Sequence, residues 1–527
     1  MFIDEAFFGL ARAGKLENGL DYPAIIRTKG TKDVDTDQDI IHILGKEVQL
    51  NGLTAPDAIH NATFTKFVET EDIMVIANGA ELIQRPRKLI EKLNQLREQA
   101  GFGKLIYLQG VLDPYLIPVL VYAGVSFFDD SMLRIETLNG VRYTMFGREN
   151  TKIGDYEANF SFVSSELKTL RAAIISGSLR EIIEKFQISS KALEILRLLD
   201  NDADGYVEKA FPRRTRYIKA NSLESLRRPD LRRYRSYIST QYKKPETRKI
   251  ALLLPCSARK PYSNSKSHRK VIETLGKLRT GIHEIIVTSP VGLVPRELER
   301  TYPAAFYDIP VIGEWYEDEK LMINSMLESY FSRNFYDHIV AFVTPDLDFI
   351  KEHLPDGSEF IYWEKGQSGS LNDLRHKMET LLNLSGRDER HVNSRMEAYV
   401  QIAKYQFGDW IESYLSGCKI VRNYNSEMLV KDGKPCLVFN EQLGKFTINK
   451  ISGQWLLDNG SFAVEIDDFK PTANIYSVGV TGVTDDVRPE DEVVLHYKGQ
   501  VRGVGIAKMS GKAMVDLKKG VAVKVRN

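Results

Sequence analysis

Residues 250–268 read Ile-Ala-Leu-Leu-Leu-Pro-Cys-Ser-Ala-Arg-Lys-Pro-Tyr-Ser-Asn-Ser-Lys-Ser-His, an apolar run of strand length that leads into a loop rich in reactive side chains. Three more apolar runs of strand length follow, at 284–288, 339–344 and 360–363. Helical patterns separate or follow these runs, at 267–280, 317–335 and 371–384. Strands that alternate with helices predict a parallel sheet with helices on both faces. We therefore expect residues 244–390 to form an α/β core domain.

The carboxyl ends of the first three predicted strands carry small and polar residues. These ends read Pro255-Cys256-Ser257, Ser289-Pro290 and Pro345-Asp346. Ligands of open α/β sheets bind outside the carboxyl ends of the strands. We therefore expect these three loops to meet at one crevice.

The loop after the first strand combines a thiol with several cations. The thiolate is the nucleophilic form of cysteine, and nearby cations or a helix N-terminus lower the pKa of a thiol. Arg259, Lys260 and His268 are the candidates for this effect on Cys256. A lone cysteine after an apolar strand is, however, commonly a buried small residue. The spacing alone leaves both interpretations of Cys256 open.

The chain of 527 residues is too long for one hydrophobic core and predicts several domains. Its three cysteines share no CxxC spacing, so we expect no structural zinc site, no disulfide framework and no metal or other cofactor. No apolar stretch reaches the roughly 18 residues of a membrane span. The first residues lack the pattern of a signal peptide. We therefore expect a cytoplasmic protein without a membrane partner.

A basic run lies at 209–249, with 14 Lys or Arg residues against three acidic ones. Tyrosines are interleaved with it, a composition that suits a phosphate backbone. The alternatives are a solvated helix face and a linker. The candidate tRNA-binding residues of this run are Arg227, Arg228, Arg232 and Arg233. Beyond the core domain, residues 391–450 predict a small α+β domain and residues 451–527 a β-barrel domain.

Three segments of the core domain resemble the archaeosine synthase family. They are residues 255–268, with the pattern Pro-Cys-Ser-x-x-Lys-Pro-Tyr-x-x-Ser-x-x-His, residues 288–299 and residues 302–315. The C-terminal segments 485–494, 503–507 and 519–526 are similar to a PUA domain. That resemblance implies a domain that recognises the shape and the sugar–phosphate backbone of RNA, with Lys508 and Lys524 as candidate contacts.

Residues 1–243 resemble the barrel of tRNA-guanine transglycosylases in a degenerate, TIM-barrel-like form. The segment Gly124-Val125-Ser126-Phe127-Phe128-Asp129 is similar to the one that carries the nucleophile of that family, which would be Asp129. The element Asp-Ser-Gly-x-Phe-Gln of the second catalytic carboxylate is absent from the sequence, as is the cysteine cluster that binds zinc. The resemblance therefore implies a domain that shapes or grips tRNA.

The archaeosine synthase resemblance implies a reaction on tRNA that carries 7-cyano-7-deazaguanine at position 15 in the D-loop. An amine adds to the nitrile, with free lysine as the favoured donor and glutamine or ammonia as the alternative. A separate radical-SAM partner enzyme then releases archaeosine. Cys256 would add first to form a thioimidate, and His268 or Asp308 would move protons.

The same resemblance suggests how the donor is held. Arg296 would pair with the donor's α-carboxylate, and Glu297 or Glu314 with its ammonium. The further substrate-binding candidates are Ser257, Lys260, Tyr262 and Ser289. Two other functions stay open, an active tRNA-guanine transglycosylase and a non-catalytic tRNA-binding protein. A homodimer also stays open.

Overall fold

The computed structural model describes most of the chain. The described residues are 2–27, 40–43, 46–49, 68–69, 72–76, 79–111, 113–185, 189–201, 205–310, 313–363, 369–386, 394–423 and 426–526. The chain forms two compact units, Met1–Thr215 with Gly460–Asn527, and Arg216–Asn459. Residues 216–243, which the sequence analysis assigns to the N-terminal domain, therefore lie in the same unit as the α/β core domain.

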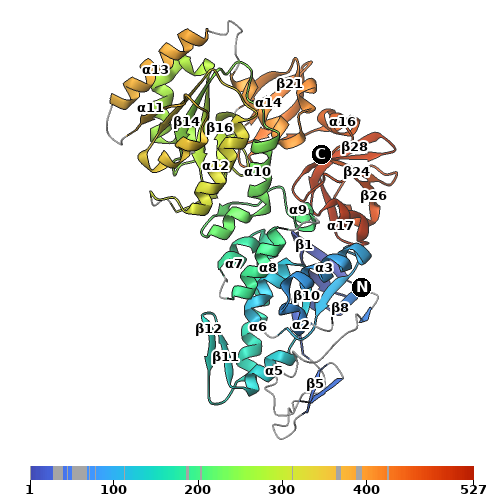
Figure 1. The fold of residues 1–527 in the computed structure, drawn as a ribbon. Coiled ribbons are helices and arrows are strands. Elements are labelled where there is room, and N and C mark those ends of the chain that lie inside the picture. Colours follow the sequence, from blue (N-terminus) through green and yellow to red (C-terminus); the bar gives the residue numbers. More distant parts are fainter. Residues whose placement is uncertain are drawn as a thin grey trace. The chain divides into compact units, whose positions relative to one another are not determined.

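The second unit is built on a five-stranded sheet with the order β16-β15-β14-β18-β19 (Figure 1). Its strands are β14 Ile250–Pro255, β15 Ile282–Thr288, β16 Gly292–Pro295, β18 His338–Val343 and β19 Glu359–Tyr362. Four strands are parallel, as predicted, and β16 is an antiparallel edge strand that the sequence analysis missed. β14 and β15 are buried along their full length, as expected of strands that helices cover on both faces.

One face of this sheet packs on α11 (Lys266–Leu275) and α13 (Gly369–Ser385). Alternate residues of β14 point to these helices, because successive side chains of a strand face opposite sides. The helices α10 (Pro229–Thr240) and α12 (Glu317–Phe331) pack on each other and on β16. The predicted helices of the core domain are thus confirmed.

The second unit contains further elements before, between and after the strands of the core sheet. They are β13 Ile218–Lys219, β17 Tyr307–Asp308, α14 Ser394–Phe407, α15 Ile411–Leu415, β20 Lys419–Asn423, β21 Ser426–Lys431, β22 Lys434–Asn440, β23 Lys445–Ile448 and α16 Lys450–Asp458. β20 to β23 form an antiparallel sheet in chain order. This helix-first α+β arrangement agrees with the prediction for residues 391–450.

The first unit contains a second α/β sheet with the order β4-β10-β9-β8-β7. Its strands are β4 Ala24–Ile26, β7 Val68–Glu69, β8 Ile73–Ile76, β9 Leu105–Leu108 and β10 Val125–Asp129. The strands β4, β10, β9 and β8 are parallel and β7 is antiparallel. Among the described residues the strand pairs form an open row, so a closed barrel stays a prediction.

Helices and short strands surround this sheet. They are β1 Phe2–Phe8, β2 Ala11–Leu16, β3 Asp21–Tyr22, β5 Ile40–Ile43, β6 Lys46–Gln49, α2 Gly79–Ile83, α3 Pro86–Ala100, α4 Ile117–Tyr122, α5 Ser131–Leu138, β11 Val141–Thr144, β12 Gly147–Asn150, α6 Tyr156–Ser176, α7 Leu179–Lys185, α8 Ser190–Asp200 and α9 Tyr206–Ala210. The helix predicted at 86–100 is found at those residues.

The C-terminal segment of the first unit forms a six-stranded sheet with the order β25-β29-β28-β27-β24-β26. Its elements are β24 Ala463–Ile466, β25 Ile475–Tyr476, β26 Val480–Val483, β27 Glu492–Tyr497, β28 Gln500–Ala507, α17 Gly511–Asp516 and β29 Val521–Arg526. Asp516 accepts a hydrogen bond from the Phe102 amide, and Asp491 pairs with Arg213. The C-terminal sheet is therefore anchored on the N-terminal part of its unit.

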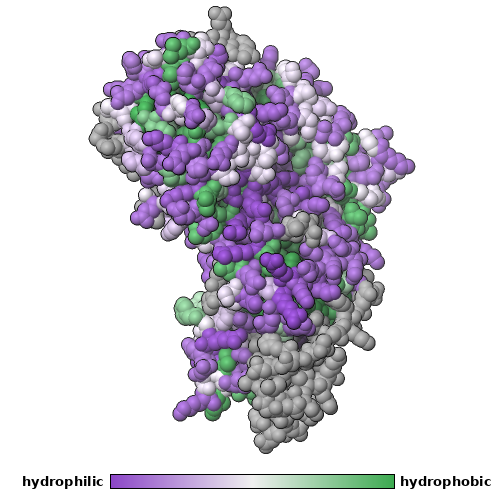
Figure 2. All heavy atoms as spheres, in the orientation of Figure 1, coloured by the Kyte–Doolittle hydropathy of each residue, from purple (hydrophilic) through white to green (hydrophobic). Residues whose placement is uncertain are grey.

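Hydrophilic side chains cover most of the face that Figure 2 shows. Within the described part of the chain, no helix has the length and the hydropathy that crossing a membrane requires.

We expect the first unit to depend on the buried ion pair between Arg180 of α7 and Asp200 of α8. Both side chains have an exposed fraction of 0%, and two hydrogen bonds of 2.7 and 2.6 Å join them. Arg180→Met should lower the free energy of unfolding by about 3–5 kcal/mol, because it leaves an uncompensated carboxylate in the interior. Urea unfolding measures this change. Arg27→Met, which removes an exposed pair with Glu157, should change the stability little. Equal effects of the two variants would contradict the expectation.

Candidate functional site

A chain of hydrogen-bonded groups lies at the carboxyl ends of β14 and β15. The parallel register places Pro255 beside Val287, so the next residues, Cys256 and Thr288, are also neighbours. The Cys256 thiol is half-buried, and the Thr288 hydroxyl lies close enough to lower its pKa. The thiol therefore lies at the edge of the sheet where the sequence predicts a crevice.

Two buried tyrosines continue this chain. The Thr288 hydroxyl lies 2.6 Å from the Tyr307 hydroxyl, which lies 2.7 Å from the Tyr262 hydroxyl. We call Thr288, Tyr307 and Tyr262 the hydroxyl chain. Sequence reasoning gave no role to Thr288 or Tyr307, although a hydroxyl residue at the end of the strand next to Cys256 was a usable signal. Tyr262 has an exposed fraction of 0%, so in this structure it packs in the core and does not stack on a substrate base.

Lys260 is the cation closest to this chain. Its ammonium nitrogen lies 3.8 Å from the centre of the Tyr307 ring, within the range of a cation–π contact. Burial lowers the pKa of Lys260, while Cys256 and Asp308 raise it in part. Asp308 itself is exposed and follows Tyr307 in β17. The structure thus brings together Cys256, Lys260 and Asp308 of the predicted site.

The pKa of the Cys256 thiol differs from the expectation. Burial raises this pKa, and the nearby Thr288 hydroxyl and the charge of Lys260 lower it only in part. Of the three candidate cations, Lys260 does lower the pKa of Cys256, but desolvation outweighs its effect. The thiol keeps its proton at neutral pH.

His268 has both ring nitrogens occupied. Arg296 can only donate, so its Nη2 donates to Nδ1 at 2.8 Å, and Nε2–H then donates to the Pro255 carbonyl at 3.0 Å. Burial and the charge of Arg296 lower the pKa of His268 to about 3. A neutral imidazole with no free nitrogen is a poor proton carrier. The geometry gives His268 a positioning function in place of the predicted acid–base role.

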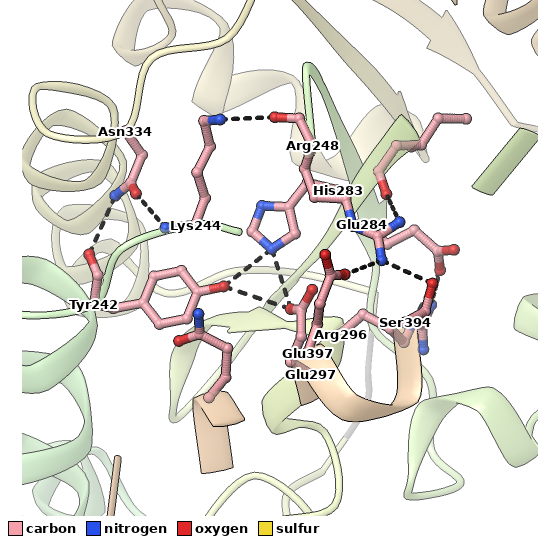
Figure 3. Close-up of polar contacts among 12 residues, drawn as sticks. Tyr242, Lys244, Arg248, His283, Glu284, Arg296, Glu297, Asn334, Ser394 and Glu397 are labelled. Carbon is pink, nitrogen blue, oxygen red and sulfur yellow. Dashed lines mark hydrogen bonds and ion pairs between the residues drawn. The ribbon is translucent and has the colours of Figure 1, made fainter. Parts of the chain in front are cut away.

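Arg296 belongs to a buried ion-pair cluster. Its guanidinium donates to Glu284 and Glu299 at 2.7–2.8 Å, in addition to His268. Figure 3 labels Arg296 and Glu284. Burial raises the pKa of Glu284, but Arg296 and Arg279 lower it to about 2. The donors of Arg296 are thus taken by the protein's own groups. This arrangement disagrees with the predicted pairing of Arg296 with a substrate carboxylate.

Glu297 lies in a different buried network, on the His283 side of β15. His283 Nε2 lies 3.1 Å from both the Glu297 carboxylate and the Tyr242 hydroxyl (Figure 3). Burial raises the pKa of Glu297, but the contact with His283 lowers it below its usual value. Glu297 has an exposed fraction of 8%. Its partner is therefore a histidine of the core, which disagrees with the predicted pairing with a substrate ammonium.

The other predicted residues of the site differ in their surroundings. The Ser257 hydroxyl donates to the Arg259 carbonyl at 3.0 Å, and Glu314 is exposed. Ser289 directly follows Thr288 and is buried, and its hydroxyl has no partner among the described residues. Buried hydroxyls are normally paired, so an unpaired one directly after Thr288 suits a ligand contact.

The basic run separates into buried and accessible residues. Arg228 has an exposed fraction of 0% and pairs with buried Asp230, so it cannot reach a phosphate in this structure. Arg232 is exposed, whereas Arg227 and Arg233 are half-buried. In the C-terminal sheet, Lys508 pairs with Glu490 at 2.7 Å and Lys524 is exposed.

Asp129 ends β10, as the resemblance to the transglycosylase predicted for a nucleophile position. Its carboxylate accepts hydrogen bonds from the Gly110 amide, the Tyr107 hydroxyl, and the amide and hydroxyl of Ser131. Burial raises its pKa, and these four bonds lower it in part. The oxygens of Asp129 are thus occupied by the protein itself.

Family models match two parts of the chain. A family model described as a domain of unknown function (DUF5591) matches residues 231–381, and the PUA domain model matches residues 466–527. The predicted PUA domain is thereby confirmed. A tRNA-guanine(15) transglycosylase of Methanobrevibacter smithii is 24% identical over 398 residues, which are 71% of this chain and 54% of that protein.

Two relatives with the same name show the family of the chain. Archaeosine synthase subunit alpha of Thermoplasma acidophilum is 50% identical over 527 residues, the full length of both chains. Archaeosine synthase subunit alpha of Methanosarcina acetivorans is 31% identical over 504 residues, 87% of this chain and 80% of that protein. The chain therefore belongs to the archaeosine synthase subunit alpha family, a family of tRNA-modifying enzymes.

Proposed function

We propose that the chain adds the side-chain amine of free lysine to the nitrile of 7-cyano-7-deazaguanine at position 15 in the tRNA D-loop. The product is an amidine that links lysine to the base, and a separate radical-SAM enzyme converts it to archaeosine. The observation that supports this proposal is the half-buried Cys256 thiol at the carboxyl end of β14, close enough to the Thr288 hydroxyl and to Lys260 for both to lower its pKa.

The protonated state of Cys256 suits the first step. Addition across a nitrile needs a nucleophile at carbon and a proton at nitrogen. The thiol supplies both: the sulfur forms a bond to the nitrile carbon, and its proton passes to the nitrile nitrogen, giving a neutral thioimidate. Thr288 contacts the thiol and is itself bonded to Tyr307, so the hydroxyl chain is placed to carry this proton.

The second step replaces sulfur by nitrogen. The neutral amine of lysine forms a bond to the thioimidate carbon, and the carbon–sulfur bond breaks with its electron pair on sulfur. The proton lost by the amine returns to the thiolate, so the enzyme is regenerated and no cofactor is consumed. Asp308 is the proposed general base for the incoming ammonium, because it is exposed and close enough to Lys260 to affect its pKa.

The remaining residues of the predicted site divide into two groups. We propose that Ser257, Ser289 and Glu314 contact the substrates, with Ser289 favoured by its unpaired hydroxyl. His268 and Arg296 act as positioning residues, because they hold the Pro255 carbonyl directly before Cys256. We propose tRNA contacts for Arg227, Arg232, Arg233, Lys508 and Lys524. Base exchange at Asp129 is disfavoured by the four donors that occupy its carboxylate.

An isotope assay tests the reaction. We expect label from lysine to appear in tRNA that carries the nitrile base, and Cys256→Ala to reduce this transfer by at least about 100-fold, because a covalent step is lost. Its affinity for tRNA should be unchanged. Cys436→Ala, a buried cysteine of β22, is the matched control.

Three outcomes would count against the proposal. Substantial transfer by Cys256→Ala would remove the thioimidate. Label from glutamine or ammonia alone would change the donor. Label from free base into unmodified tRNA, with none from lysine, would favour a transglycosylase.

The pH profile of alkylation tests the surroundings of Cys256. We expect iodoacetamide to modify Cys256 with a midpoint above the value for a free cysteine, about 8.5, because burial raises the pKa of the thiol. Lys260→Met and Thr288→Val should each move the midpoint higher, since both groups favour the thiolate. Thr288→Ser keeps the hydroxyl and should leave it unchanged. Mass spectrometry separates Cys256 from Cys418 and Cys436, and a midpoint below that of free cysteine would contradict the assignment.

A further inference from the structure

A hollow of about 160 Å³ is lined by residues of α6, α7 and the turn of the β11–β12 hairpin, all within the first unit. Figure 1 labels these elements. Its walls are mainly apolar. The lining residues are Met145, Phe162, Ser165, Glu166, Thr169, Leu170 and Ile182. The hollow belongs to neither the Cys256 site nor the C-terminal PUA domain. Its volume and lining suit a small, largely apolar group.

One polar group in this hollow has no partner. The Oε2 atom of Glu166 is buried and accepts no hydrogen bond from the described residues. Burial and the nearby charge of Asp113 raise the pKa of Glu166 to about 8, so the carboxyl is mostly neutral at pH 7. A neutral carboxyl both donates and accepts a hydrogen bond. It can therefore bind the polar edge of a ring that carries an adjacent donor and acceptor.

The rim of the hollow is apolar and exposed. Phe146, at the turn of the hairpin, has an exposed fraction of 88%, and its neighbour Met145 one of 56%. Residues 141–152 also contain three basic residues, Arg142, Arg148 and Lys152, against the single acidic residue Glu149. Phe146 lies at the turn, Arg148 pairs with Asp113 and Glu136, and Arg142 and Lys152 lie toward the base of the hairpin. An exposed aromatic ring on the same element as cations is common in sites for unpaired nucleotides.

We propose that this hollow binds an unpaired nucleobase of the tRNA. The base enters between the apolar walls and pairs its polar edge with Glu166, Phe146 stacks on the adjacent base, and Arg142 and Lys152 contact the phosphates. A neutral carboxyl suits this site, since an ionised one would repel the backbone. The proposal rests on tRNA as the substrate and is independent of the lysine transfer at Cys256.

Equilibrium binding of the full-length protein to an unmodified tRNA transcript tests the stacking contact. Phe146→Ala should weaken binding on the order of 10-fold, as expected for one lost base–aromatic contact. Phe146→Trp should restore it. Ile153→Ala removes a side chain of similar exposure, 87%, just beyond the hairpin and should leave the affinity unchanged. Unchanged affinity of Phe146→Ala would overturn the proposal and leave the exposed ring to a protein partner.

Two further measurements separate the parts of the proposal. Ser165→Phe places a ring from the exposed side of α6 into the hollow and should weaken tRNA binding several-fold; unchanged binding would overturn the role of the hollow. Phe146→Ala should not weaken binding to a fully paired RNA duplex, because its bases are not accessible for stacking. An equal loss on both RNAs would contradict base recognition. Cys256→Ala should bind normally, so failure here and failure of the lysine transfer are distinguishable.

Discussion

The arrangement of the candidate active site depends on the buried contacts of Arg296. Two carboxylates fix this guanidinium, and its remaining donor fixes His268 in the neutral tautomer with hydrogen on Nε2. That hydrogen holds the Pro255 carbonyl, which directly precedes Cys256. A salt-bridged side chain of the β16 region thus sets the backbone that presents the thiol. Since an arginine does not lose its proton, Arg296 holds His268 in the same way at any pH near neutrality.

Burial of the site also raises the pKa of the Cys256 thiol and so makes it a weaker acid. A cysteine protease lowers the pKa of its nucleophile with an adjacent imidazolium, whereas the imidazole here is held neutral and turned toward the backbone. Addition to a nitrile differs from peptide hydrolysis. Its first step releases no leaving group, and it requires a proton for the nitrile nitrogen. A protonated thiol next to a chain of hydroxyl groups satisfies that need without a strong external acid.

The sequence predicted the architecture better than the roles of single residues. The four parallel strands follow from the length and spacing of their apolar runs, and Cys256 follows from its position at a strand end. The edge strand β16 was missed because it follows β15 after a turn of only three residues, 289–291, and no helix separates the two. Arg296, Glu297 and Arg228 were misjudged for a common reason. Their partners Glu284, His283 and Asp230 are chosen by the packing of neighbouring elements, and the charge pattern of a sequence does not show which charges are neutralised in the interior.

The hydrogen bonds of Asp129, the last residue of β10, give its carboxylate a structural function. Its four donors come from Tyr107 of β9, from Gly110 just after β9 and from Ser131 at the start of α5, so the carboxylate ties together the elements at the carboxyl edge of the first sheet. A carboxylate whose oxygens each accept two hydrogen bonds has little electron density left for attack on a sugar carbon. Removing it would leave the Gly110 and Ser131 amides unpaired in a buried place, at a cost of roughly 1–3 kcal/mol for each group. Structural demand is therefore sufficient to explain an aspartate here, which agrees with the proposal that the reactive group is Cys256.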